Sequence, residues 1–137
     1  IFSYPENSHT EDYRQEVLDL VNAQRAKYGL TALEMGDDDL TAAAQTRAEE
    51  IAVVNSHVRP DGSKCFTVLK DYGVTDTPTG ENAAWGSVSP EEVVNAWMNS
   101  EGHRANILNP EARKMSVGYY YNSNSTWGHQ WIQIFTK

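Results

Sequence analysis

The sequence predicts an α+β fold in which helices cover both faces of a small sheet. Apolar residues recur at helical spacing through the first two thirds of the chain, whereas the last third alternates as strands do. In the final predicted strand, Trp131 and Phe135 point to one face and Ile132 and Ile134 to the other. Both faces are therefore apolar, and each needs a covering layer.

The length and composition predict one compact domain over residues 1–137. The chain has 137 residues, of which 39% are hydrophobic and 10% aromatic, enough for one core and too few for two domains. Residues 1–10 are rich in Ser, Pro, Asn and Thr, and we expect them to form an extended arm.

The charge of the chain argues against nucleic acid as a partner. The formal net charge is −8, and no cluster of Lys and Arg of the kind that follows a phosphate backbone is present. The longest aliphatic run, residues 51–54, is far shorter than the roughly 20 apolar residues of a membrane-spanning helix. We therefore expect no membrane-spanning segment, and the oligomeric state stays open.

The cysteine content limits which cross-links and metal sites the chain can form. Cys65 is the only cysteine, so neither an intramolecular disulfide nor a zinc site built on cysteine pairs can form. We expect it to be a partly buried, inert thiol. The sequence starts at Ile1 without a methionine, which leads us to expect that an upstream segment was removed and leaves export open.

Four helices are predicted from periodicity and end signals. The first spans about 11–28, with Thr10 as a candidate cap, and the second runs from Asp37 to about Asn55 along an alanine-rich stripe. A short helix follows over 64–72, and Ser89-Pro90 begins a helix over about 90–100. The segment 73–80 is predicted to be a polar loop.

Two strands close the chain. Residues 115–121 and 127–135 alternate as strands, and the polar stretch 122–125 between them is predicted to be a hairpin connection. The aromatic residues of this hairpin, Tyr119 to Tyr121, Trp127 and Trp131, favour core packing over a lipid or sugar groove.

Four polar residues are candidates for a functional site: His57, Glu81, Glu92 and His103. His57 follows a helix end, Glu81 follows Gly80, and His103 is predicted to lie on a loop after a helix. Imidazole and carboxylate together suit a cation such as zinc, with a position left open for water. Their spacing matches no local metalloprotease motif, so separate solvated residues remain an alternative.

Other chemistries stay open at this point. Ser100 lies three residues before His103, and Ser56 precedes His57, so a Ser/His hydrolase is possible, although no nucleophile elbow is present. Glu81 and Glu92 could also act as the carboxylate pair of a glycosidase. We expect His129 to lie in the core or at its rim rather than in the site.

Several segments in order resemble one family. They are Asn55-Ser56-His57, Gly80-Glu81-Asn82, the helix from Glu92 to Trp97, the segment from Ser100 to Leu108, and the closing Trp131 to Phe135. Together they resemble the CAP superfamily (cysteine-rich secretory proteins, antigen 5 and pathogenesis-related 1) in its bacterial secreted branch, over Val17 to Phe135.

The resemblance implies a three-layer α-β-α sandwich with a small, mainly antiparallel sheet and a central cavity. It places the family's cavity tetrad on His57, Glu81, Glu92 and His103, with His57 and His103 as ligands of a divalent cation, often zinc. It further implies an extracellular or cell-surface protein whose small-molecule, lipid or cell-envelope ligand is unspecified. Catalysis, with Glu81 and Glu92 as candidates, and cation-independent binding of lipid or cell wall both remain open.

Overall fold

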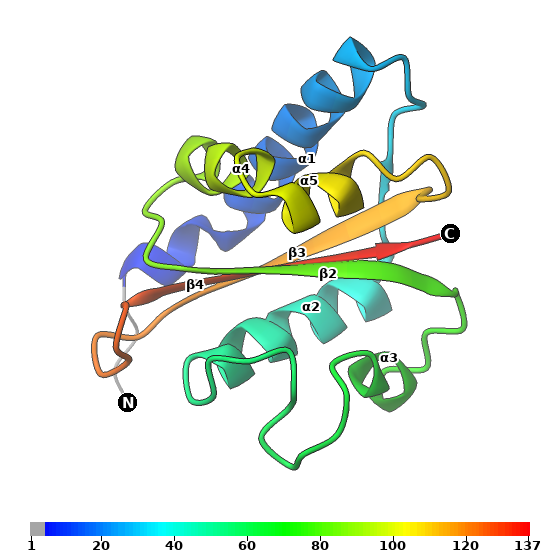
Figure 1. Ribbon diagram of the computed structural model, residues 1–137. Coiled ribbons are helices and arrows are strands. Elements are labelled where there is room, and N and C mark those ends of the chain that lie inside the picture. Colours follow the sequence, from blue (N-terminus) through cyan, green and yellow to red (C-terminus); the bar gives the residue numbers. More distant parts are fainter. Residues whose placement is uncertain (1–4) are drawn as a thin grey trace.

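A four-stranded sheet separates two layers of helices in the computed structural model, which describes residues 5–137 (Figure 1). The strand order is β1-β3-β4-β2, with β1 (Glu34–Met35), β2 (Pro78–Trp85), β3 (Lys114–Tyr121) and β4 (His129–Thr136). β4 pairs antiparallel with both β2 and β3, and the short β1 pairs parallel with β3. The predicted α+β fold with a mainly antiparallel sheet is confirmed.

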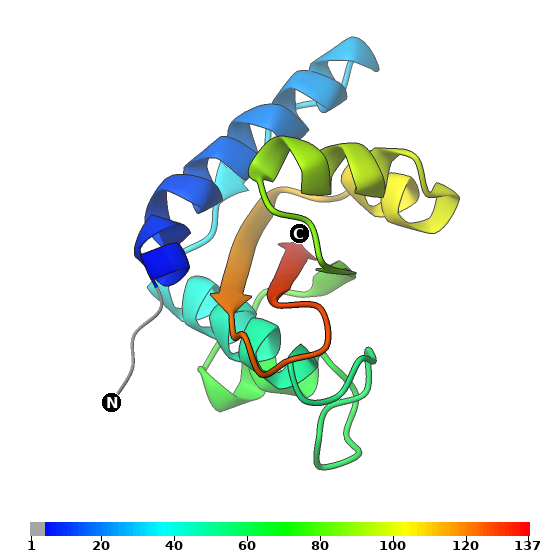
Figure 2. The ribbon, with the colours of Figure 1, turned by 90° about the vertical axis from the view of Figure 1, so that its left-hand side faces the viewer.

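Helices cover both faces of this sheet, as the apolar pattern of the last strand predicts. α1 (Thr10–Lys27), α4 (Pro90–Met98) and α5 (Glu101–Ile107) lie on one face, and α2 (Asp38–Ile51) and α3 (Thr67–Asp71) lie on the other (Figures 1 and 2). Trp131 and Phe135 belong to the core on the α1 side, and Ile132 and Ile134 to the core on the α2 side. Each face of β4 is thus buried in its own core.

Close packing of α2 on the sheet depends on small residues. A Cβ atom built on Gly118 of β3 would lie 2.1 Å from the backbone oxygen of Ala44 in α2. Only a glycine lets the helix backbone approach the strand this closely. The alanine-rich stripe of α2 serves the same approach from the helix side, with Ala43, Ala44 and Ala48 fully buried.

Two predicted helix starts are confirmed by their caps. The Asp37 carboxylate accepts a hydrogen bond from Leu40 N at 3.0 Å, and Ser89 Oγ accepts one from Glu92 N at 3.2 Å. Each satisfies a backbone donor of the first turn, which otherwise has no partner in the helix.

The predicted extended arm is wrong for those of its residues that the structure describes. Residues 1–4 of the expected extended arm lie outside the described residues, and Pro5–His9 form a 3₁₀ helix, η1, which leads directly into α1. Asn7 anchors it by a two-way hydrogen bond with the backbone of Tyr121, at 3.1 and 2.8 Å. Thr10 is not the cap: it is the first residue of α1, and its hydroxyl donates to Asn7 O.

Three other element boundaries differ from prediction. α2 ends at Ile51 rather than near Asn55, because the next residues leave the core, Val53 being 79% exposed. β2 begins at Pro78, inside the predicted loop, since an edge strand tolerates a proline that lacks the N–H donor. α5 occupies the segment predicted as a loop around His103.

Most aromatic residues of the hairpin pack in the core, as the sequence predicts. Tyr119 and Trp131 are buried and in contact, with ring centroids 4.5 Å apart. Trp127 lies outside β4, which begins only at His129, and is 57% exposed. Cys65 is a buried free thiol, and burial raises its pKa to about 11, so it stays protonated at neutral pH.

No helix among residues 5–137 is both long enough and apolar enough to span a lipid bilayer.

Candidate functional site

Glu81 lies in the middle of β2 with its carboxylate buried on the α2 side of the sheet. It forms a two-pronged ion pair with Arg47 of α2, whose Nε and Nη2 atoms lie 2.9 and 3.1 Å from the two carboxylate oxygens. The side chains of Glu81 and Arg47 are 1% and 0% exposed. The strand therefore fixes the position of Glu81, which in the sequence directly follows the predicted loop 73–80.

His57 is held against this carboxylate by a loop. Its Nδ1 atom lies 2.7 Å from Oε1 of Glu81, and its side chain is 54% exposed. Because an ionised carboxylate only accepts, the hydrogen sits on Nδ1, and neutral His57 keeps its lone pair on Nε2. The outer nitrogen of the imidazole is thus free to accept a proton or bind a cation.

The loop that carries His57 is tied to the helices by further ion pairs. Arg47 also contacts Glu50, and Arg59 contacts both Glu50 and Asp71 of α3, each pair at 2.8–2.9 Å. Arg47 Nη2 donates to the backbone oxygen of Ser56, next to His57. We call the series Asp71, Arg59, Glu50, Arg47, Glu81 and His57 the charge chain.

Charges alternate along the charge chain, and this sets the protonation of its inner end. Burial alone would raise the pKa of Glu81, but hydrogen bonds from His57 and Arg47 outweigh burial and hold the pKa below its ordinary value. The hydrogen bond to Glu81 raises the pKa of His57, in spite of partial burial. The pair thus favours an ionised Glu81 and a basic imidazole.

His103 approaches from the opposite helix layer, on α5. Its Nδ1 atom is hydrogen-bonded to Ser100 Oγ at 2.9 Å. Ser100 occupies the N-cap position of α5, yet its hydroxyl makes no capping bond to the helix backbone. The serine contacts the imidazole instead, and this again leaves the Nε2 atom of His103 unoccupied by any hydrogen bond within residues 5–137.

Side-chain amides fasten α5 to β2 at this point. Asn82 Nδ2 donates to the backbone oxygen of His103 at 3.1 Å, and Asn106 Nδ2 donates to Asn82 Oδ1 at 2.8 Å. A Cβ atom on Gly80 would lie 2.5 Å from Asn106 Oδ1, so a glycine is needed for this close contact. The Gly80-Glu81-Asn82 segment therefore positions both histidines, Glu81 on one face of β2 and Asn82 on the other.

The two histidines interact electrostatically. Burial lowers the pKa of His103, and the charge of His57 lowers it further. Hence His57 is the more basic of the two and His103 the less basic, so a pH range exists in which only His57 is protonated. Such a separation of pKa values suits a pair that handles protons as well as a pair that binds a cation.

Glu92 makes no hydrogen bond or ion pair with His57, Glu81 or His103 within residues 5–137. It is exposed in the first turn of α4, and its charge acts on His129, whose pKa is lowered by burial and partly restored by Glu6 and Glu92. His129 begins β4, five residues before Ile134, the partner of Glu81, a separation of about 17 Å along a strand. The place of Glu92 in the site rests on the resemblance alone.

The sequence analysis misses the residues that hold the site, above all Arg47. A signal was present, because Arg47 falls on the apolar stripe of α2 between Ala44 and Ala48. A charged residue on a buried helix face requires a charged partner. Glu50, Arg59 and Asp71 give no comparable signal, since charged residues are ordinary on surfaces.

Metal coordination by residues 5–137 is restricted by the small number of donor side chains that lie together. No group of three or more His, Cys, Asp or Glu side chains in this part of the chain could hold a metal ion. The Glu81 carboxylate is already committed to Arg47 and His57. A cation held by His57 and His103 alone would have to fill its other positions with water or ligand.

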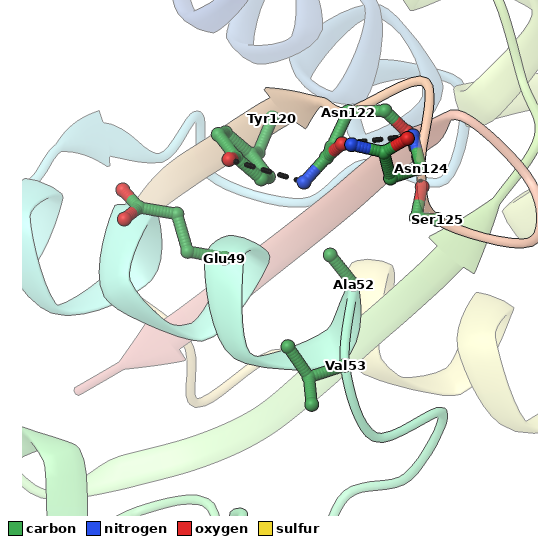
Figure 3. Close-up of a pocket in the computed structure, with 7 residues that line it drawn as sticks. All are labelled: Glu49, Ala52, Val53, Tyr120, Asn122, Asn124 and Ser125. Atoms are coloured by element: carbon green, nitrogen blue, oxygen red, sulfur yellow. Dashed lines mark hydrogen bonds between the residues drawn. The ribbon is translucent and has the colours of Figure 1, made fainter. Parts of the chain in front are cut away.

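A small polar hollow lies elsewhere, between the end of α2 and the loop joining β3 to β4 (Figure 3). Its volume is about 220 Å³, and its polar lining includes Tyr120, Asn122 and Ser125. The Glu49 side chain extends away from the asparagines (Figure 3). None of the four predicted site residues lines this hollow, so it is separate from the site.

Comparison with known proteins decides the family. The model of the cysteine-rich secretory protein family (CAP) matches residues 18–135. The chain belongs to the CAP family. The match begins within α1 and ends within β4, so it includes both histidines, Glu81 and the strands that position them.

Relatives of this CAP domain occur in bacteria and plants. It is 41% identical to protein YkwD of Bacillus subtilis over 127 residues, which is 91% of this chain and 49% of YkwD. It is 29% identical to pathogenesis-related protein 1C of tobacco, covering 82% of this chain and 59% of that protein. The chain thus spans about half the length of YkwD.

Solved structures agree with the fold. An extracellular protein of Bacillus anthracis that contains an SCP domain superposes with a TM-score of 0.85 at 25% identity, over 100% of this chain and 45% of that one. An outer surface protein of Borrelia burgdorferi gives 0.73 at 25% identity, covering 90% of each chain. The CAP domain described here is of the kind found in bacterial extracellular proteins.

Proposed function

We propose that this CAP domain belongs to an extracellular bacterial protein and binds a divalent cation, zinc by preference, through Nε2 of His57 and His103. The remaining coordination positions would take water or a small polar or cell-envelope ligand. The extracellular location is proposed because two similar solved structures are those of an extracellular protein and an outer surface protein. The cation follows from the chemistry of the two imidazoles.

The observation that carries the proposal is the 2.7 Å contact between His57 and Glu81. Histidines that bind metals usually donate their other ring N–H to a carboxylate or carbonyl group, which fixes the tautomer and makes the ligand nitrogen more basic. Glu81 does this for His57, and Arg47 keeps Glu81 ionised. Ser100 offers the corresponding contact to His103.

The donor set fits zinc with open positions rather than a closed structural site. Zinc accepts imidazole nitrogen readily, and two protein ligands leave at least two tetrahedral positions free. When bound there, the cation would supply Lewis-acid polarisation of an oxygen atom of a ligand. His57 and His103 would hold it, and Glu81 and Ser100 would orient the two rings.

Calorimetric titration with zinc chloride at pH 7 and pH 5 tests the proposal. We expect one zinc per chain at pH 7 and at least tenfold weaker binding at pH 5, because protons compete for both imidazoles. A His57→Ala/His103→Ala double variant should lose the binding. His9→Ala is the matched control, since His9 stacks on Tyr13 away from the site. Unchanged binding by the double variant overturns the proposal.

A Ser/His hydrolase is the second candidate, favoured by one contact. Ser100 Oγ lies within hydrogen-bond distance of His103, whose lowered pKa keeps the imidazole neutral and able to take a proton. This mechanism predicts that Ser100→Ala abolishes ester or peptide hydrolysis and that a fluorophosphonate probe labels Ser100. Absence of labelling on the folded protein would exclude it.

A further inference from the structure

A groove separate from the histidine site lies beside α3. It is lined by residues of α3 and of 74–78, the segment that leads into β2. Its volume is about 400 Å³, and Phe66, Leu69, Val74 and Pro78 give it a largely apolar lining. This volume lies within the range of small-molecule sites, roughly 300–1,000 Å³. None of His57, Glu81 and His103 lines it.

Two lysines without acidic partners stand at the groove. Lys64 and Lys70 both line it and are exposed, and no ion pair joins either of them to another residue within 5–137. One carboxylate, Asp76, also lines the groove, and it is paired with Lys114 at 3.3 Å. Asp71, next to Lys70 in the sequence, is paired with Arg59 at 2.8 Å, and Asp61 does not line the groove. The lining thus carries two lysines against one carboxylate that is paired elsewhere, a local excess of positive charge on a chain with a net charge of −8.

We propose that this groove binds a small amphipathic organic anion. The apolar body would lie against Leu69, Val74 and Pro78, and a carboxylate, sulfonate or phosphate group would lie between the ammonium groups of Lys64 and Lys70. Burial of the apolar body supplies most of the affinity, and the lysines select the sign of the charge. The site is independent of the proposed cation site.

A free small anion fits this charge pattern better than an anionic membrane surface. Attraction to a membrane grows with each basic residue near it, and sites of this kind use clusters of four to eight Lys and Arg. The groove offers two lysines on a strongly acidic chain. Binding to anionic vesicles without binding to a soluble anion would contradict the proposal.

Fluorescence titration with 8-anilinonaphthalene-1-sulfonate tests the site, and its uncharged analogue N-phenyl-1-naphthylamine separates charge from apolar contact. We expect saturable binding of the sulfonate to the folded wild type, weakened roughly tenfold by Lys64→Gln/Lys70→Gln, since each exposed charge contributes modestly. The neutral analogue should bind both proteins equally. Val74→Ser should weaken both probes.

The controls address unfolding and unspecific charge. Lys27→Gln removes an exposed lysine at the end of α1, on the other face of the sheet, and should leave both probes unaffected. Because the sulfonate also binds molten states, each variant must retain its near-ultraviolet circular dichroism. Equal weakening by Lys27→Gln, or no weakening by the double lysine variant, overturns the proposal. The His57→Ala/His103→Ala variant should bind both probes normally, whatever its affinity for zinc.

Discussion

The Nδ1 atom of His57 lies 2.7 Å from Oε1 of Glu81, and this contact joins a half-exposed imidazole to a carboxylate that is 1% exposed. The same carboxylate is held from its other side by Arg47. A loop histidine, mobile by default, is thereby fixed to a strand at the edge of the sheet. The orientation of His57 depends on the buried ion pair more than on its own loop.

Replacement of Glu81 by glutamine should destabilise the domain. The variant leaves the buried guanidinium of Arg47 without its main counter-charge, and loss of one partner of a buried pair costs about 3–5 kcal/mol. Urea unfolding of both proteins measures the difference. Glu91→Gln, an exposed carboxylate of α4, should change the unfolding free energy by less than about 0.5 kcal/mol. Equal effects of the two variants would contradict a structural role for the Glu81 pair.

The two site histidines should titrate in opposite directions from the ordinary value. The pKa of His57 is raised by its hydrogen bond to Glu81, and the pKa of His103 is lowered by burial and by the charge of His57. Nuclear magnetic resonance of the imidazole nitrogens against pH measures both. In Glu81→Gln the pKa of His57 should fall. A His57 pKa at or below that of His103 in the wild type would refute this.

The same shifts set the sign of the pH dependence of stability. The pKa of His57 is higher in the folded than in the unfolded state, so its contribution is complete below about 6.5 and is lost as the pH rises through the folded pKa. The lowered pKa of Glu81 gives a contribution present above about 4.5 and lost as the pH falls. We expect unfolding free energies, measured in urea from pH 3 to 9, to lose the upper dependence in His57→Gln.

Ser100 should act on His103 rather than on the stability of α5. Because its hydroxyl contacts Nδ1 of His103 and caps nothing, Ser100→Ala should alter the tautomer ratio of His103 and weaken zinc binding. The unfolding free energy should change by less than about 0.5 kcal/mol. Ser89→Ala is the matched control: loss of a true cap should cost about 1 kcal/mol and leave the nitrogen spectrum of His103 unchanged.

Two glycines should respond oppositely to alanine. In Gly118→Ala the new methyl group would meet the Ala44 backbone oxygen at 2.1 Å, and overpacking of this kind costs typically about 1–3 kcal/mol. Gly102 lies within α5, and an added methyl group there would meet no atom within 4 Å, so Gly102→Ala should stabilise by roughly 0.5–1 kcal/mol. Thermal unfolding midpoints measure both, and a stabilised Gly118→Ala would refute the close approach of α2.

Regular, local signals predicted much of the fold. The apolar spacing of α1 and α2, the acidic start of α2 at Asp37, the cap at Ser89 and the two-sided apolar pattern of β4 depend on neighbours in the sequence. They could therefore be read directly. β2 gave no such signal, because Pro78, Gly80 and Asn82 are poor strand formers. Its pairing with β4 overrides these local preferences.

The sequence by itself determined the α+β class, the unpaired cysteine, and, through several segments in a fixed order, the family and the candidates His57, Glu81 and His103. Only the tertiary structure decided that Arg47 holds Glu81 and that Glu81 holds His57. The reason is physical: the protonation of a buried group depends on partners tens of residues away in the sequence. Composition and periodicity do not indicate which charged residues come into contact.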